Sequence, residues 1–237
     1  GCGGSIAIHG NNTKILNSTF MQCNAYDGGV IYINGSNTLI DGYSCIMSFA
    51  ANNGGAIFVE GNYANIADFN ISLTNATNYG GAIYVAGDFT KINNSSFTRC
   101  IADNYDGGAL YIAGANATVS NSKFLQNRVN QESGRGGSVD ITGNYTKLLN
   151  CTFIMCTAFD GGVVNIEGSH AYIDGFVSNM TSATNQGGAL YIAGDHATVN
   201  HFNIGYSNAT NDGGVIYITG EDDVNILNGV INTCIAR

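Results

Sequence analysis

The chain has 237 residues and a formal net charge of −9, because 17 Asp and Glu outnumber 8 Lys and Arg. Hydrophobic residues make up 44% of the chain and charged residues 11%, a balance that excludes an intrinsically disordered protein. The basic residues are scattered singly, which excludes a nucleic-acid-binding surface, and no apolar run approaches the roughly 18 to 20 residues of a membrane span.

A pair of adjacent glycines recurs through the whole chain at intervals of 25 to 29 residues. Positions 3 and 5 after the first glycine of each pair are aliphatic in all nine units, and position 7 is always glycine. Apolar residues two apart, bounded by glycine, predict a short strand with one buried face. Positions are counted from the first glycine of each pair, which is position 0. These first glycines are Gly3, Gly28, Gly54, Gly80, Gly107, Gly136, Gly161, Gly187 and Gly213.

Each unit is expected to supply three short strands. The first lies at positions 3 to 5, which are residues 6–8 in the first unit. Apolar residues at position 12, such as Ile15, and at position 17, such as Phe20, predict the other two. In the last unit position 17 is Val230, and Ile226 stands one place later than position 12. Glycine is expected where the turns require a positive φ.

A unit of about 26 residues with three short strands cannot bury its own apolar face, so successive units have to stack. Leucine-rich repeats have a similar period but need a Leu-x-x-Leu-x-Leu pattern, and a β-propeller blade needs about 40 residues. The remaining solution is an all-β, single-stranded parallel β-helix of about nine coils. Equal positions then lie above one another, about 4.8 Å apart. We expect residues 1–237 to form one continuous β-helix.

A longer repeat lies over the short one. Residues 10–103 recur in residues 143–237, since a shift of 133 residues maps GNNTKILNSTFMQC onto GNYTKLLNCTFIMC. Five coils therefore form a duplicated block. Both ends of the chain fall within the repeat pattern, so we expect the natural protein to continue beyond this segment, or other elements to cover its end coils.

The strings GGAIYVAGDFTKINNSSFTRCIA (residues 80–102) and GGALYIAGANATVSNSKFLQN (residues 107–127) resemble the repeats of two protein families. One is the adhesin-like surface proteins of methanogenic archaea, built from right-handed parallel β-helix repeats. The other is the polymorphic outer-membrane adhesins of chlamydiae, marked by Gly-Gly-Ala-Ile/Leu/Val and Phe-x-x-Asn. The archaeal group is the more similar because of the frequent Asn-x-Thr triplets. The resemblance implies a right-handed coil and an extracellular, cell-surface location.

Position 4 lies between the two buried positions of the first strand and is expected to point outward. Stacked coils would align its aromatic residues in one stripe, interrupted by Asp140 and Asn165. Flat rings with a polar tip suit the apolar faces of sugars or a partner protein, so the stripe is a candidate binding surface. The alternative is that the rings only stabilise the sheet by stacking. The candidates are Tyr32, Phe58, Tyr84, Tyr111, Tyr191 and Tyr217.

Asn-x-Ser/Thr triplets are more frequent than random placement would give, which is typical of a glycosylated surface protein. The alternative is that a tandem repeat multiplies an accidental triplet, and that asparagine suits the turns. The candidate N-glycosylation sites are Asn11, Asn17, Asn34, Asn70, Asn75, Asn93, Asn94, Asn116, Asn144, Asn150, Asn179 and Asn208.

The seven cysteines are an odd number, so at least one thiol in this segment has no disulfide partner within it. Cys23, Cys100 and Cys156 share position 20 in coils too far apart for a disulfide, and we interpret them as buried thiols. Two pairs, Cys151 with Cys156 and Cys23 with Cys45, are close enough in the predicted coil to be candidates for a bond. No C-x-x-C occurs, so thiolate metal binding is not expected.

Two irregular features have both a functional and a structural interpretation. His170, His196 and Asp222 share position 9 in consecutive coils and could bind a divalent cation, although a solvated turn is the preferred interpretation. The insertion Asn127–Arg135, with Arg128 and Glu132, is either a contact for a partner or a tolerated loop. We predict no metal and no cofactor.

Parallel β-helices also carry polysaccharide lyases and hydrolases, so an enzyme remains an alternative. Asp41 and Asp68 on adjacent coils could approach the separation of an inverting carboxylate pair. A surface copied every 133 residues lacks the single pocket that catalysis requires, however, and we predict no catalytic activity.

The preferred hypothesis is an extracellular cell-surface adhesin, or the stalk of one. Its expected partner is a cell-surface glycan or a protein of a host or partner cell. A structural coat or fibre component assembled end to end through its end coils is the second hypothesis.

Overall fold

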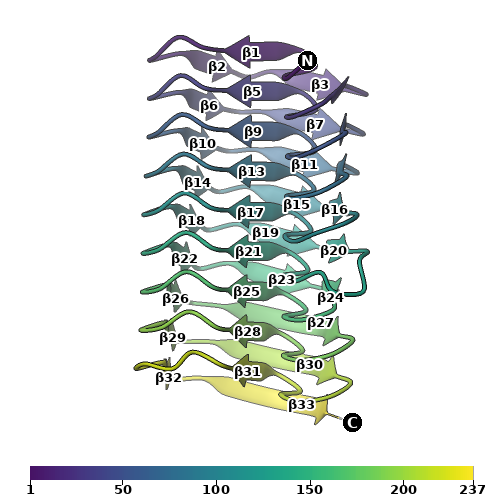
Figure 1. Ribbon diagram of the computed structural model, residues 1–237, viewed down its shortest axis with the longest axis vertical. Helices are drawn as coiled ribbons and strands as arrows, with labels where there is room; N and C mark the ends of the chain where they lie inside the picture. The colour runs from purple at the N-terminus through teal and green to yellow at the C-terminus, as the bar shows by residue number, and fades with distance from the viewer. Residues whose placement is uncertain (237) are drawn as a thin grey trace.

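The computed structural model describes residues 1–236 as an all-β rod of three parallel sheets, with the chain ends at opposite ends of the rod (Figure 1). Neighbouring strands within each sheet come from successive repeat units. The prediction of a parallel β-solenoid of about nine coils is therefore confirmed. Among the described residues there is no helix with the length and apolarity that a membrane crossing requires.

The first and second sheets have nine strands each. The first consists of β1 (Ile6–Ile8), β5 (Ile31–Ile33), β9 (Ile57–Val59), β13 (Ile83–Val85), β17 (Leu110–Ile112), β21 (Val139–Ile141), β25 (Val164–Ile166), β28 (Leu190–Ile192) and β31 (Ile216–Ile218). The second consists of β2 (Lys14–Leu16), β6 (Leu39–Asp41), β10 (Asn65–Ala67), β14 (Lys91–Asn93), β18 (Thr118–Ser120), β22 (Lys147–Leu149), β26 (Tyr172–Asp174), β29 (Thr198–Asn200) and β32 (Asn225–Leu227).

The third sheet has 15 strands in two rows, which the long strands β27, β30 and β33 join across a bend. One row consists of β3 (Thr19–Met21), β7 (Ser44–Ile46), β11 (Asn70–Ser72), β15 (Ser96–Thr98), β19 (Lys123–Leu125), β23 (Thr152–Ile154), β27 (Val177–Ala183), β30 (Asn203–Ala209) and β33 (Val230–Ala236). The other consists of β4 (Asn24–Ala25), β8 (Phe49–Ala50), β12 (Asn75–Ala76), β16 (Ile101–Ala102), β20 (Arg128–Val129) and β24 (Thr157–Ala158).

Equal positions of successive units are paired along the whole rod. Ile33 lies opposite Val59, and Tyr84 lies opposite Tyr111. The last unit departs from this rule by one residue, because its turn after β31 holds an extra residue. Ile231 therefore pairs with Ile204, and the assignment of Val230 to the buried position 17 is wrong.

Most corners of the coil do not use glycine, contrary to the expectation that glycine marks each positive φ. Positions 9, 14 and 19 adopt a left-handed conformation with ordinary side chains, for example Phe89, Asn94 and Arg99 with φ of 57°, 50° and 55°. The glycine at position 7 serves another purpose. A Cβ on Gly61 would lie 2.2 Å from the carbonyl oxygen of Gly35 in the preceding coil, so only glycine fits there.

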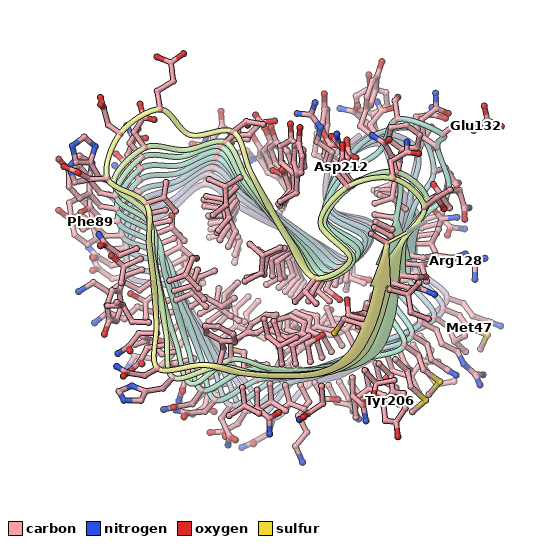
Figure 2. All side chains as sticks on the ribbon, turned by 90° about the horizontal axis from the view of Figure 1, so that it is seen from below. Met47, Phe89, Arg128, Glu132, Tyr206 and Asp212 are labelled. Carbon is pink, nitrogen blue, oxygen red and sulfur yellow. The ribbon has the colours of Figure 1, made fainter. Side chains whose placement is uncertain are left out.

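The paired glycines bend the wall of each coil inward (Figure 2). The first glycine has a positive φ throughout, 63° at Gly80 for instance. The second packs against main chain on two sides, and a Cβ on Gly81 would lie 2.2 Å from the Gly108 carbonyl oxygen and 2.4 Å from that of Ile101. This close approach separates the large core from a small cluster of Ala102, Val129 and Ala158.

Positions 15 and 17 fill the interior jointly, which the pattern at position 17 alone did not reveal. Phe97, Phe124 and Phe153 stack at centroid distances of 4.8 and 4.6 Å, and position 15 in their coils is serine or cysteine. Where position 17 is the smaller Cys45, position 15 supplies the buried ring of Tyr43. The alternation keeps the interior filled, as close-packed cores require.

All seven cysteines are free thiols, so neither candidate pair forms a disulfide. Cys100 and Cys156 are buried, as expected for position 20, whereas Cys23 is half-buried. Burial raises the pKa of Cys100 and of Cys151 to about 12. These two thiols therefore stay protonated at neutral pH and behave as small apolar side chains.

Candidate functional site

The aromatic residues at position 4 form two stacked columns on the outer side of the first sheet. The ring of Phe58 lies 5.6 Å from that of Tyr32 and 4.8 Å from that of Tyr84, and Tyr84 lies 5.1 Å from Tyr111. At the other end of the rod Tyr191 and Tyr217 are 5.4 Å apart. All six side chains point away from the core, as the alternation predicts, but they are only partly exposed.

The partial burial follows from the inward bend of the wall, which brings the turn before each glycine pair opposite the first sheet (Figure 2). We call this segment the facing turn and refer to it together with the position-4 residues as the aromatic face. Tyr79 of a facing turn lies 4.6 Å from the ring of Tyr111 and stacks on Tyr105 at 4.8 Å. The aromatic face therefore has rings on both of its sides.

Asp140 and Asn165 interrupt the aromatic column and are fully buried, with exposed fractions of 1% and 0%. The amide nitrogen Nδ2 of Asn165 donates a hydrogen bond of 2.9 Å to Oδ2 of Asp140. Oδ1 of Asp140 and Oδ1 of Asn165 have no hydrogen-bond partner within the described chain. Two buried oxygen acceptors without donors are unusual and mark this gap as the most polar point of the face.

Carboxylates crowd around the gap. Burial, followed by the charge of Asp106, raises the pKa of Asp140 well above its usual range, and burial also raises the pKa of Asp106. Among residues 1–236 the cation at this gap is Arg135, which is ion-paired with Glu167 and lies 3.8 Å from a carboxylate oxygen of Asp160. Its backbone N–H also donates a 2.7 Å hydrogen bond to Oδ1 of Asp106.

Arg135 belongs to the facing turn that follows the insertion, and its guanidinium lies 5.4 Å from the ring centroid of Tyr191. The insertion is shorter than Asn127–Arg135. Asn127 is buried at position 20, where its Oδ1 accepts a 2.9 Å hydrogen bond from the backbone N–H of Cys100, and β20 follows it directly. The extra residues lie between Val129 and Arg135, with Glu132 exposed on the outside (Figure 2).

The histidine column is a stack rather than a chelating arrangement. His170 and His196 lie 4.7 Å apart with an interplanar angle of 2°. Asp223, not Asp222, takes the equivalent corner of the next coil, because the extra residue shifts the last unit. Within residues 1–236, no group of three or more His, Cys, Asp or Glu side chains is arranged to hold a metal ion.

The carboxylates considered for catalysis lie on an exposed corner. Asp68 accepts a hydrogen bond from the amide of Asn94, and Asp41 is partly exposed. In the duplicated block the same corner carries a contact of 2.9 Å between Nδ1 of His201 and Oδ1 of Asp174. The two blocks therefore place different chemistry at equivalent corners.

None of the twelve candidate glycosylation asparagines is buried. Asn75, Asn93 and Asn179 are partly exposed, and the other nine are exposed. The amide nitrogen to which a glycan would attach is used in some of them, as in Asn34, where Nδ2 donates a 2.7 Å hydrogen bond to Glu60. Such sites would lose an internal contact on modification.

The aromatic face thus offers flat apolar rings on both sides of a buried polar gap. The rings and the interruption were predictable from the sequence, whereas the facing turn, the contacts of Arg135 and the burial of Asp140 were not. One feature of the sequence could have pointed to this site. Arg135 stands directly before Gly136, and the unit that begins at Gly136 is the one with Asp at position 4. No protein-family model matches the chain, and neither curated proteins nor solved structures provide a match to it.

Proposed function

We propose that the rod is a non-catalytic, extracellular binding module: a cell-surface adhesin or the stalk that displays one. The observation that carries the proposal is the aromatic face, where rings from successive coils align beside the rings of the facing turns. Tyrosine presents a rigid apolar ring and a hydroxyl at its edge, which suits the alternating apolar and hydroxyl-bearing faces of sugars. The proposed partner is a cell-surface glycan or a protein of a host or partner cell.

Two further features support a surface location. The repeat resembles those of the adhesin-like surface proteins of methanogenic archaea, and the many accessible Asn-x-Ser/Thr triplets suit a glycoprotein. The low content of Lys and Arg and the net charge of −9 keep such a rod soluble and discourage binding to nucleic acid.

Binding to a printed array of defined oligosaccharides tests the proposal. The double variant Tyr84→Ser and Tyr111→Ser removes two adjacent rings of the aromatic face and is expected to lower the signal of any bound oligosaccharide about tenfold or more. The matched control is Tyr63→Ser with Phe89→Ser. It removes another stacked pair, 4.9 Å apart, from an exposed corner of the coil (Figure 2).

Loss of binding in the first variant with retention in the control supports the proposal. Absence of binding to every oligosaccharide, or equal loss in both variants, contradicts it. Because Tyr84 and Tyr111 also pack against their neighbours, thermal unfolding of both variants has to show that the rod remains folded.

A structural coat or fibre component is the second candidate. The last described coil exposes inward-facing apolar side chains, including Ile218 and Ile231, whose counterparts in the coil before, Ile192 and Ile204, are buried. End-to-end stacking of rods would continue the parallel sheets. Electron micrographs of the purified chain distinguish this candidate, since it requires long fibres with an axial repeat of about 4.8 Å.

A further inference from the structure

A second concave site lies on the outside of the third sheet, at the bend between its two rows of strands. It is a pocket of about 600 Å³, a size that suits a small ligand. Its walls combine the apolar side chains of Leu73, Ile101 and Met155 with the two guanidinium groups of Arg99 and Arg128. Figure 2 shows Arg128 projecting from this side of the coil, whereas Asp212 marks the facing turn of the aromatic face.

The coil geometry explains how two arginines reach one pocket. Arg99 occupies the left-handed corner at position 19, and Arg128 lies in β20, opposite Ile101 of the preceding coil. The residue between these positions points into the core, as the buried Asn127 does, so the side chains on either side of it point outward, where both arginines line the pocket. Neighbouring coils thus offer one guanidinium from the corner and one from the strand.

Both guanidinium groups have unused donors. Nε of Arg99 donates a 2.9 Å hydrogen bond to Gln126, and Nε of Arg128 donates a 2.8 Å hydrogen bond to Asn130. Within residues 1–236 no carboxylate pairs with either of them, whereas Arg135 has two such partners. Of the described arginines, the two without an ion pair line the same pocket, in a chain whose net charge is −9.

Asp103, which lies beside the pocket, is engaged with amide groups. Asp103 accepts hydrogen bonds from Nδ2 of Asn75 at 3.0 Å and from Nδ2 of Asn130 at 2.7 Å. Asn75 also lines the pocket, and its Oδ1 is buried without a hydrogen-bond partner among the described residues. The pocket therefore offers cationic donors for an anion, and no carboxylate is among its lining residues.

We propose that this pocket binds a sugar acid, with Arg99 and Arg128 holding its carboxylate. The planar guanidinium fork matches a carboxylate, and such charge-assisted hydrogen bonds are the stronger ones in proteins. Gln126 and Thr157 supply acceptors and donors for ring hydroxyls, and Leu73, Ile101 and Met155 contact the apolar edge of the sugar. This site is separate from the aromatic face and does not depend on the function proposed for that face.

Nuclear magnetic resonance titrations of the chain with D-glucuronate, D-glucose and acetate test the proposal. Glucuronate is expected to shift the backbone amide signals around Arg99 and Arg128 in a saturable way. Glucose lacks the carboxylate and acetate lacks the ring, so each is expected to bind at least tenfold more weakly. Raising the salt concentration is expected to weaken glucuronate binding.

Two variants take their replacements from the neighbouring coils. Arg99→Gln introduces the residue that Gln126 already supplies at position 19, and Arg128→Thr introduces the residue found at Thr157. Each is expected to weaken glucuronate binding about tenfold or more while leaving thermal unfolding unchanged. Lys91→Gln removes one positive charge from the second sheet and is expected to change the affinity by less than about twofold.

Absence of saturable shifts with glucuronate overturns the proposal. Equal affinity for acetate and glucuronate also overturns it, since the pocket would then bind any small anion. Unchanged affinity in Arg99→Gln and Arg128→Thr would place the sugar elsewhere. Retention of glucuronate binding in the Tyr84→Ser and Tyr111→Ser variant separates this site from the aromatic face.

Discussion

Replacing Gly81 with alanine is expected to lower the free energy of unfolding by about 4 kcal/mol or more, or to prevent folding altogether. The added Cβ would lie 2.2 Å from the carbonyl oxygen of Gly108 and 2.4 Å from the carbonyl of Ile101. These atoms belong to main chain on two sides of the inward bend, so the clash cannot be relieved by moving a side chain. Urea denaturation followed by circular dichroism measures the effect.

Gly205→Ala is the matched control for Gly81→Ala. Gly205 lies within β30 with an ordinary φ, and the nearest atom to an added Cβ is Oδ1 of Asn179 at 3.5 Å. Alanine is expected to change the unfolding free energy there by less than about 1 kcal/mol, since it also restricts the unfolded chain. A Gly81→Ala variant as stable as Gly205→Ala would show that the wall does not bend inward as described.

Replacing Asp140 with asparagine is expected to stabilise the rod at pH 7 and to leave its stability nearly unchanged at pH 4. The pKa of Asp140 is raised in the folded rod, chiefly by burial and then by the charge of Asp106. Glu167 acts in the same direction, while Arg135 and the hydrogen bond from Asn165 oppose the rise. Asparagine fits the site, because Asn165 occupies the same position in the next coil.

The direction in which stability changes with pH follows from the binding of a proton to Asp140. Below a pH of about 4, the usual pKa of an aspartate, Asp140 is protonated in both the folded and the unfolded chain. As the pH rises further, the unfolded chain loses this proton first while the folded rod retains it. Stability therefore falls with rising pH until the raised folded-state pKa is passed. Asp140→Asn removes this loss of stability, because asparagine does not titrate.

Thermal unfolding of the wild type and of Asp140→Asn between pH 4 and pH 7 measures the difference. The melting temperatures are expected to coincide near pH 4 and to diverge toward pH 7, with the variant higher. Asp106 also has a raised pKa, so some decrease with pH remains in the variant. Glu132→Gln removes one charge from the exposed insertion and serves as the control. If the melting temperatures of Asp140→Asn and of the wild type changed in parallel with pH, this would contradict a raised pKa of Asp140 in the folded rod.

The repeat predicts those parts of the rod that every coil shares. Positions 3 and 5 fill the interior and position 7 contacts the main chain of the coil before it, so the same residue types are required at each level. Ile33, Val59 and Gly61 are therefore recognisable from the pattern alone. The pairing of equal positions follows because each strand needs a partner above and below.

Features that depend on how the wall bends were not predictable in this way. An alternating pattern shows that Asp140 points away from the core, but not that the facing turn covers it. The same limitation applies to Arg135, whose contact with Glu167 joins residues in neighbouring coils. The pocket beside Arg99 and Arg128 was also missed, because single basic residues at different positions do not form a motif. The extra residue of the last unit is visible in the sequence, because Ile226 stands one place late, but the shift was not carried on to position 17, where Ile231 and not Val230 takes the buried place.

Both proposed sites are assembled from neighbouring coils, so both depend on the stacking of equal positions of successive units directly above one another. Nuclear Overhauser spectra of the isotopically labelled chain test it most directly. Backbone cross-peaks are expected between Ile66 and Ile92, and between Tyr84 and Tyr111, which are paired in parallel strands. Cross-peaks that instead join strands of one unit as antiparallel hairpins, or that are displaced by a residue along the middle of the rod, would contradict it.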